Sequence, residues 1–524
     1  MQLDCLIKNA TVFDGNSIDE QRLDVGISGE RIAYVGDGLS SSSGKEIVEA
    51  HGLYLCPGFI DTHASTGLGY MLPHAGDNKL YQGVTTEIIG NCGSSTAPIG
   101  ELLLPTMAAL ADQIGFRFSW RSLRDWLELI EAHGLPFNSG TLIGHNTLRT
   151  GICADAQTAT PNEILQMGDL LEQALQDGAL GLSTGLVYAP GSFAETSEII
   201  DLATVVARYG GNYASHIRNE RESLEDSIEE AIEIGRRASV PVLVSHLKAA
   251  EKPNWGKIPR VIETIEAARA QGIKITFEVY PYTAVSTKLR TFLPKESLSD
   301  GLERMVSKLK RPDWRERCIA WLESRQTDFA TMVLITESVS GGRGRSIQEI
   351  AEQEKRRPAE MLVDILIRDP EAWIVYHCIS EADMEAALLW PASIVCSDSW
   401  SYPVNAPDPI GDPHPRTYGA FTRFLEKYAI RNQIIPFGLA VKKISSFASD
   451  FLGLANRGRI REGNFADLTL LDPTKVKELA TFEKPRQFSE GTEFVWVNGT
   501  KMIERGALLN ALPGKVVKRG QHVG

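Results

Sequence analysis

Five side chains that can bind a metal ion or carry a proton come directly after apolar stretches of this sequence. They are His63, Cys92, His216, His246 and Asp398. Two imidazoles and one thiolate form a catalytic zinc site with a free position for water, and such a site makes that water nucleophilic near neutral pH. An aspartate nearby can take the proton from the water and hand it to a leaving amine. The set therefore predicts a hydrolase that uses Zn²⁺.

Each of these residues also has a structural interpretation when it is taken singly. A cysteine after an apolar strand is usually a small core residue. A lone histidine near a strand end is more often structural than a ligand. Five such groups after five different strands are much harder to explain by chance. Whether they form one site depends on how the strands that carry them are arranged.

Eight apolar segments alternate with amphipathic helical stretches in the middle of the chain. The strands are predicted at residues 55–61, 84–91, 140–144, 179–184, 212–216, 240–246, 275–281 and 394–398. This alternation predicts an α/β fold, a parallel (β/α)₈ barrel of the TIM type. The active site of such a barrel lies at the carboxyl ends of its strands, where all five side chains are expected.

The two ends of the chain differ from the middle because they contain short strands separated by turn residues. We expect residues 1–55 and 455–524 to build one β-sandwich, with the barrel formed by 56–284 and 351–454. Residues 285–350 break the alternation of strands and helices. They are predicted to form a small inserted domain.

Composition excludes several classes of function. The chain has 54 Lys and Arg against 67 Asp and Glu, a net charge of −13, and no basic run, which argues against nucleic-acid binding. Its seven scattered cysteines lack CxxC spacing and are typical of reduced thiols. No signal peptide and no apolar run of 18 residues are evident, so we expect a cytoplasmic protein with a small-molecule substrate and no membrane partner. An oligomer is compatible with the sequence.

The segment PGFIDTHAS at residues 57–65 matches the first-strand signature of metal-dependent amidohydrolases except at its last residue. That signature ends in His-x-His, whose two imidazoles point the same way because side chains of a strand repeat every two residues. Here the second position is Ser65, and a hydroxyl binds Zn²⁺ far less well than imidazole. Three explanations follow: the site has lost a metal, has moved its ligands, or is no longer catalytic. His74 could swing back to replace the imidazole, although a surface histidine is the more common case.

Motifs along essentially the whole chain resemble the D-aminoacylases, which are the N-acyl-D-amino-acid deacylases of the amidohydrolase superfamily. They are GVTTEIIGNCG at 83–93, GLSTGLVYAPG at 181–191, YASHIRNE at 213–220, SHLKAA at 245–250, VYPYTA at 279–284 and HPRTYG at 414–419. The resemblance implies the amidohydrolase barrel with its β-sandwich and inserted domain. It also implies hydrolysis of the amide bond of an N-acyl-D-amino acid or a related small amide that bears a carboxylate.

Carried over by position, the resemblance implies a tightly held zinc bound by Cys92, His216 and His246. A weaker second metal of the family would use His63 and the position of Ser65, so we predict one Zn²⁺ per chain. Asp398 matches the family's catalytic aspartate, the general base and acid of the reaction.

The resemblance further implies that Tyr188, Lys248, Ser286 and Arg416 hold the substrate carboxylate. Arginine offers a planar fork for a carboxylate and lysine a point charge, which agrees with this assignment. The alternative is that Lys248 and Arg416 are solvated or paired with structural acids.

Two further basic residues, Arg290 and Lys295, are candidates for reading an acidic substrate side chain. Basic residues in such a segment are more often simply solvated.

Two other functions use the same residues. The metal site could serve a cyclisation, an isomerisation or a lactam opening, which the altered first-strand motif and Val285 suggest. A catalytically inactive homologue retained for binding is the third hypothesis. The sequence argues against this third hypothesis, because it contains the whole set of Cys92, His216, His246 and Asp398.

Overall fold

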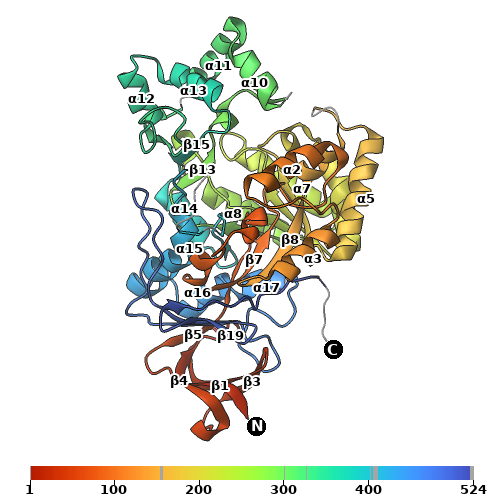
Figure 1. The fold of residues 1–524 in the computed structure, drawn as a ribbon. Helices are drawn as coiled ribbons and strands as arrows, with labels where there is room; N and C mark the ends of the chain where they lie inside the picture. The colour runs from red at the N-terminus through yellow and green to blue at the C-terminus, as the bar shows by residue number, and fades with distance from the viewer. Residues whose placement is uncertain are drawn as a thin grey trace.

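In the part of the chain that the structure describes, eight parallel strands form the central sheet (Figure 1). The computed structural model describes residues 2–153, 157–299, 301–325, 327–401, 403–404 and 411–519, so the last five residues of the predicted C-terminal segment lie outside it. Each strand of this sheet pairs with the strands that come directly before and after it in the list that follows. The strands are β6 (Phe59–Asp61), β7 (Val84–Ile89), β8 (Asn138–Gly144), β9 (Gly181–Gly185), β10 (Asn212–His216), β11 (Val242–Val244), β12 (Ile275–Val279) and β16 (Ile394–Val395).

The predicted α/β barrel is confirmed by this sheet, with one difference at its first strand. Residues 55–61, predicted as a single strand, divide between β5 (Tyr54–Pro57), which belongs to another sheet, and β6 of the barrel. Gly58 marks the division, because a Cβ at this position would lie 2.1 Å from the Thr85 side chain. The chain therefore passes from one sheet to the other at a point where only glycine fits.

The barrel is open between its first and last strands, and a buried carboxylate joins them. Among the described residues, β6 and β16 share no ladder of backbone hydrogen bonds; past their ends, Ala64 and Ser399 form a single bridge. Asp61 Oδ1 accepts the backbone N–H of Ser397 at 3.0 Å, and Asp61 Oδ2 accepts from Lys79 Nζ at 2.5 Å. Since Asp61 and Lys79 are both fully buried, this ion pair has a structural role at the seam.

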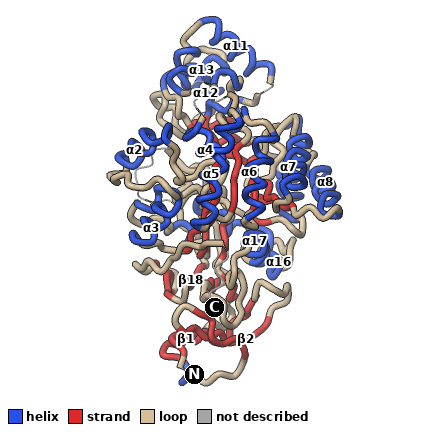
Figure 2. Tube along the Cα trace, turned by 90° about the vertical axis from the view of Figure 1, so that its right-hand side faces the viewer, coloured by secondary structure: helices blue, strands red, loops and turns tan. Residues whose placement is uncertain are grey.

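Helices cover the outside of the barrel (Figure 2). Many begin with clear signals, as at α5, where Thr160 and Glu163 form a capping box around a proline at the helix start. Among the described residues, no helix has both the length and the apolar character needed to cross a bilayer. The helices are α1 (Asp77–Leu80), α2 (Leu104–Gln113), α3 (Leu123–His133), α4 (His145–Ile152), α5 (Pro161–Asp177), α6 (Thr196–Arg208), α7 (Leu224–Ala238), α8 (Ile258–Ala270), α14 (Glu381–Leu389), α15 (Arg416–Phe424), α16 (Phe437–Lys443) and α17 (Ser446–Leu452).

Both ends of the chain contribute to a nine-stranded sheet with its own hydrophobic core. β5 pairs in parallel with the N-terminal β1 and antiparallel with the C-terminal β17, which joins the two ends. The other strands of the nine-stranded sheet lie on both sides of the junction formed by β1, β5 and β17. The sheet consists of β1 (Leu3–Val12), β2 (Gln21–Ser28), β3 (Arg31–Gly36), β4 (Gly44–Glu49), β5, β17 (Leu468–Leu471), β18 (Thr492–Val497), β19 (Thr500–Glu504) and β20 (Ala507–Leu508).

A three-stranded sheet with several helices lies above the barrel in Figure 1. It is formed by β13 (Ala284–Lys288), β14 (Met332–Leu334) and β15 (Trp373–His377), with α9 (Lys295–Leu298), α10 (Leu302–Leu309), α11 (Pro312–Ser324), α12 (Ile347–Gln353) and α13 (Pro358–Arg368). The domain boundaries stay a prediction. However, β15 is the central strand of this sheet, and its pairing favours an end of the insertion after residue 377 rather than at 350.

Candidate active site

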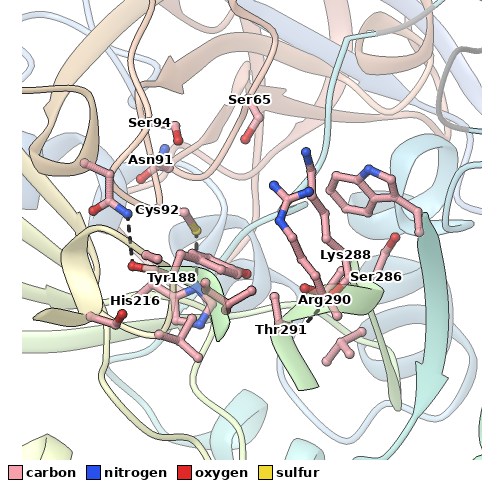
Figure 3. A pocket seen from close by; sticks show the side chains of 18 of the residues that line it. Ser65, Asn91, Cys92, Ser94, Tyr188, His216, Ser286, Lys288, Arg290 and Thr291 are labelled. Carbon is pink, nitrogen blue, oxygen red and sulfur yellow. Dashed lines mark hydrogen bonds between the residues drawn. The ribbon is translucent and has the colours of Figure 1, made fainter. Parts of the chain in front are cut away.

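Three histidine side chains converge on the thiol of Cys92 beyond the carboxyl ends of the barrel strands (Figure 3 shows Cys92 with His216). The Cys92 Sγ lies 3.2 Å from His63 Nε2, 3.4 Å from His246 Nε2 and 3.5 Å from His216 Nδ1. Asp398 reaches the same cluster, with its Oδ1 3.5 Å from His63 Nε2. The structure thus brings together all five residues that the sequence placed at strand ends.

The backbone at these positions turns sharply to aim the side chains. Cys92, His246 and Asp398 have φ angles of +52°, +36° and +49°, in the left-handed region that side-chain-bearing residues rarely adopt. Gly90 prepares the turn to Cys92, because its φ is +80° and a Cβ there would lie 2.0 Å from the carbonyl oxygen of Leu142. Such local strain is typical of functional sites and is maintained by the surrounding fold.

The electrostatics of the cluster suit a metal ion. Burial raises the pKa of the Cys92 thiol, but the charges of His63 and His246 outweigh this effect and lower the pKa to about 7. Burial lowers the pKa of His216 to about 4, which keeps its imidazole neutral. A thiolate with imidazole nitrogens is a ligand set that Zn²⁺ prefers. The residues present therefore fit a zinc ion.

Two carboxylates, Glu278 and Glu220, lie beside the three histidines, and no sequence motif predicted a role for them. Glu278, fully buried on β12, hydrogen-bonds His63 Nδ1. Glu220 Oε1 lies 3.2 Å from His246 Nδ1 and 3.5 Å from His216 Nε2. A carboxylate that accepts a hydrogen bond from His63 Nδ1 leaves His63 Nε2 free to face Cys92, as in carboxylate–histidine–zinc groups. One signal was available for Glu278, a charged residue inside the otherwise uncharged segment 275–281.

Asp398 is held in its ionised form by a neighbouring arginine. Its Oδ2 accepts from Arg416 Nη2 at 2.9 Å. Burial alone would raise the pKa of Asp398, but the Arg416 charge brings it to about 2. The carboxylate is therefore able to accept a proton throughout the neutral pH range.

The four residues expected to hold a carboxylate all line one cavity, together with Cys92 and Asp398. Lys248 Nζ is 2.6 Å from Glu220 Oε1, so both Lys248 and Arg416 have an acidic partner. Buried Arg416 nevertheless keeps its Nη1 without a hydrogen-bond partner among the described residues. The Tyr188 ring packs edge-on against His216 with centroids 4.9 Å apart, and Ser286 lies on β13. An unmet guanidinium donor at the cavity is suited to an anionic ligand.

The position of the missing first-strand imidazole opens onto the cavity. Ser65 is exposed there, and its backbone N–H donates to the Ser399 carbonyl oxygen at 3.1 Å. His74 does not take its place: the His74 side chain is 72% exposed and lies 3.4 Å from Asp77. His145 is buried away from the cluster and bonds Glu198 at 2.7 Å.

The cavity has a volume of about 1960 Å³ and extends from the barrel to the small domain. On its small-domain side, Lys288 and Arg290 both pair with Glu371, and Figure 3 shows the two cations opposite Asn91 and Ser94. The exposed Lys295 lines the cavity as well. Two cations that share one carboxylate leave a net positive charge at this wall.

The sequence profile of the amidohydrolase family matches residues 46–384 and 396–502. The chain therefore belongs to the amidohydrolase family. A D-aminoacylase from Alcaligenes xylosoxydans xylosoxydans is 32% identical over 517 residues, which cover 98% of each chain. This relationship places the protein among the D-aminoacylase-like hydrolases that act on carbon–nitrogen bonds other than peptide bonds, and the predicted family and enzyme class are confirmed.

Solved structures give the same result. An N-acyl-D-glutamate deacylase from Bordetella bronchiseptica, crystallised with zinc and a phosphonate mimic of the tetrahedral intermediate, has a TM-score of 0.83 and 29% identity. A D-aminoacylase described as having a binuclear metal centre with one-metal activation and second-metal attenuation has a TM-score of 0.83 and 31% identity. Each comparison covers 99% of this chain and 100% of the other.

Proposed function

We propose that the protein hydrolyses the amide bond of N-acyl-D-amino acids with one Zn²⁺ per chain. The observation that carries the proposal is the position of the Cys92 sulfur, 3.2–3.5 Å from three imidazole nitrogens beside an ionised Asp398. When bound, zinc supplies an activated water and polarises the carbonyl under attack. The zinc-containing relative and the relative with one-metal activation support the choice of metal and number. The cytoplasm is the expected location.

Each residue of the site has a role in this proposal. Zinc would be held by Cys92, His216 and His246, while His63 lacks the second imidazole needed for a further tight site at Ser65. Asp398 takes a proton from the attacking water and gives it to the departing amine as the C–N bond breaks. Hydrolysis then yields one carboxylic acid and one amino acid.

The substrate carboxylate is expected to meet Arg416, Lys248, Tyr188 and Ser286. Arg416 is the central member, because its Nη1 has no partner among the described residues and its other terminal nitrogen holds Asp398. Binding of a carboxylate there places the substrate directly beside the general base. This contact would couple recognition of the substrate to its orientation.

The net positive wall formed by Lys288 and Arg290 supports an acidic side chain on the amino acid. The burial of the Lys288 ammonium lowers its pKa, and the Arg290 charge adds to this effect, so the pair gains from a second anion beyond Glu371. An N-acyl-D-glutamate or N-acyl-D-aspartate supplies that anion. The relative that acts on N-acyl-D-glutamate agrees with this choice.

The direct test measures amine release from N-acetyl-D-glutamate and N-acetyl-L-glutamate by the zinc-loaded protein. We expect hydrolysis of the D isomer to exceed that of the L isomer by at least about 100-fold, since a carboxylate held at Arg416 fixes one face of the α-carbon. A protein with one zinc that hydrolyses neither isomer, while it opens or forms a cyclic amide, would favour the alternative reaction instead.

Arg290→Met tests the acidic side-chain site. We expect kcat/KM for N-acetyl-D-glutamate to fall by about 10- to 100-fold, because a hydrogen bond between charged groups is lost. The value for N-acetyl-D-leucine should stay within about threefold of wild type. Arg311→Met removes an exposed arginine paired with Asp313 and is the control. Equal losses for both substrates would exclude a role of Arg290 in reading the side chain.

A further inference from the structure

The two sides of the cavity around Cys92 differ in charge. Its small-domain side presents six cations and, among the described lining residues of 285–325, a single acid, Glu296. The cations are Lys288, Arg290, Lys295, Arg304, Arg317 and Arg325.

The side formed by residues 65–157 is different. Arg149 is the one charged side chain among the described lining residues there, and Glu198 neutralises it at 2.8 Å. Figure 1 shows α2 on one side of the barrel mouth and β13 with β15 on the other.

Six apolar side chains define this second part of the cavity, which we call the apolar arm. They come from the turn after Ser65, from the short helix at 101–103 and from α2. The six are Leu68, Leu72, Leu103, Met107, Leu110 and Ile114. Leu110 is 42% exposed although it lies in the cavity lining. A leucine that faces solvent inside a cavity is suited to contact with an apolar ligand.

Ser65 connects the apolar arm with the reacting centre. It is exposed to the cavity, and its hydroxyl has no hydrogen-bond partner among the described residues. The hydroxymethyl group is much smaller than an imidazole. The residue type at 65 therefore leaves free space between Cys92 and the turn that carries Leu68.

We infer that the apolar arm binds the acyl group of the substrate and that this group is an unbranched alkyl chain of about six to ten carbons. The scissile amide joins an anionic amino acid to an acyl group. A cavity with a cationic side, an uncharged side that includes the apolar arm, and the proposed zinc ligands in its lining matches those two parts. This inference rests on the proposed hydrolysis of N-acyl amides and adds the chemical class of the acyl group.

Size supports a long chain rather than acetyl. The cavity of about 1960 Å³ exceeds the roughly 300–1,000 Å³ of ordinary small-molecule sites. An acetyl group has one carbon beyond the carbonyl, so the apolar arm would stay in contact with water when such a substrate is bound. Each further methylene that the arm buries is worth up to about fourfold in binding.

The test compares N-acetyl-, N-hexanoyl- and N-decanoyl-D-glutamate with the zinc-loaded protein. We expect kcat/KM to be at least about tenfold higher for the hexanoyl than for the acetyl substrate, through burial of added methylenes. The decanoyl substrate should be at least as good as the hexanoyl. Equal or falling kcat/KM from acetyl to decanoyl would overturn the inference.

The variant Leu110→Gln tests whether the acyl chain binds in the apolar arm. It should lower kcat/KM for the decanoyl substrate by about fivefold and leave the acetyl substrate unchanged, because only the long chain reaches α2. The matched control is Leu102→Gln, which alters a leucine that is 54% exposed and lies outside the cavity lining defined by the described residues. Equal effects of the two variants on the decanoyl substrate would place the acyl chain elsewhere.

A binding measurement separates this inference from the proposed reaction. Calorimetric titration of the zinc-loaded protein with sodium decanoate and sodium acetate requires no turnover. Decanoate should bind at least about 100-fold more tightly than acetate, and Leu110→Gln should weaken decanoate alone. If decanoate binds in this way but no N-acyl amide is hydrolysed, the reaction assignment fails and the apolar arm stands. If hydrolysis occurs but decanoate binds no better than acetate, the apolar arm does not bind the acyl group and the inference fails.

Discussion

Replacing Asp398 with asparagine is expected to lower kcat for N-acetyl-D-glutamate by about 10²- to 10⁴-fold, the contribution of a general base and acid. Asparagine keeps the shape of the side chain but cannot accept the proton that the ionised carboxylate takes. The carboxylate is available for this because the Arg416 charge brings the pKa of Asp398 to about 2. Steady-state kinetics on the zinc-loaded variant give the result directly.

Two measurements keep this experiment interpretable. Zinc content should stay near one per chain, because Cys92, His216 and His246 are unaltered. Asp412→Asn changes an aspartate that is paired with Arg343 at the surface, and it should retain wild-type kcat. An Asp398→Asn enzyme with one zinc and a kcat within threefold of wild type would show that another group moves the proton.

Cys92→Ala is expected to remove the zinc and reduce kcat/KM by at least about 10³-fold. The sulfur is the atom that all three imidazoles approach, and its loss leaves one ring nitrogen each of His216 and His246 as ligands. Two imidazoles hold Zn²⁺ far less tightly than a set that includes thiolate. Metal analysis of dialysed protein by mass spectrometry measures the loss.

Cys56→Ala is the control, since Cys56 is a buried thiol that lies on β5 in the other sheet. It should keep both zinc and activity. His63→Asn gives a second contrast: with serine at position 65, we expect it to retain about one zinc per chain. Retention of a full zinc complement in Cys92→Ala would contradict the proposed ligand set.

The barrel could be predicted because its strands alternate with amphipathic helices, and buried parallel strands are continuous apolar runs. Residues 212–216 were predicted to form a strand, and β10 has the same bounds. The passage from β5 to β6 could not be predicted in this way. Both segments are apolar, and only contact with Asp467 and Thr85 from elsewhere in the chain separates them at Gly58.

The site was predictable to the extent that it follows the ends of strands. Cys92, His216 and His246 each come within a few residues of an apolar strand, so the fold alone brings them together. The roles of Glu278 and Glu220 could not be predicted, because they depend on contacts with histidines that are distant in the sequence. Glu278 meets His63 across 215 residues of sequence, and no local pattern encodes that contact. The same is true of Lys248 and Glu220, 28 residues apart.

The buried contact between Asp61 and Ser397 has a consequence for how the protein is made. These residues are 336 positions apart, and they join the two edges of the open barrel. A ribosome that has released β6 to β12 has therefore produced a sheet with two unpaired edges, and strands in that condition are prone to aggregate. Asp398 emerges directly after Ser397. The general base thus reaches its place only when the last strand docks, and a truncated nascent chain has no complete site.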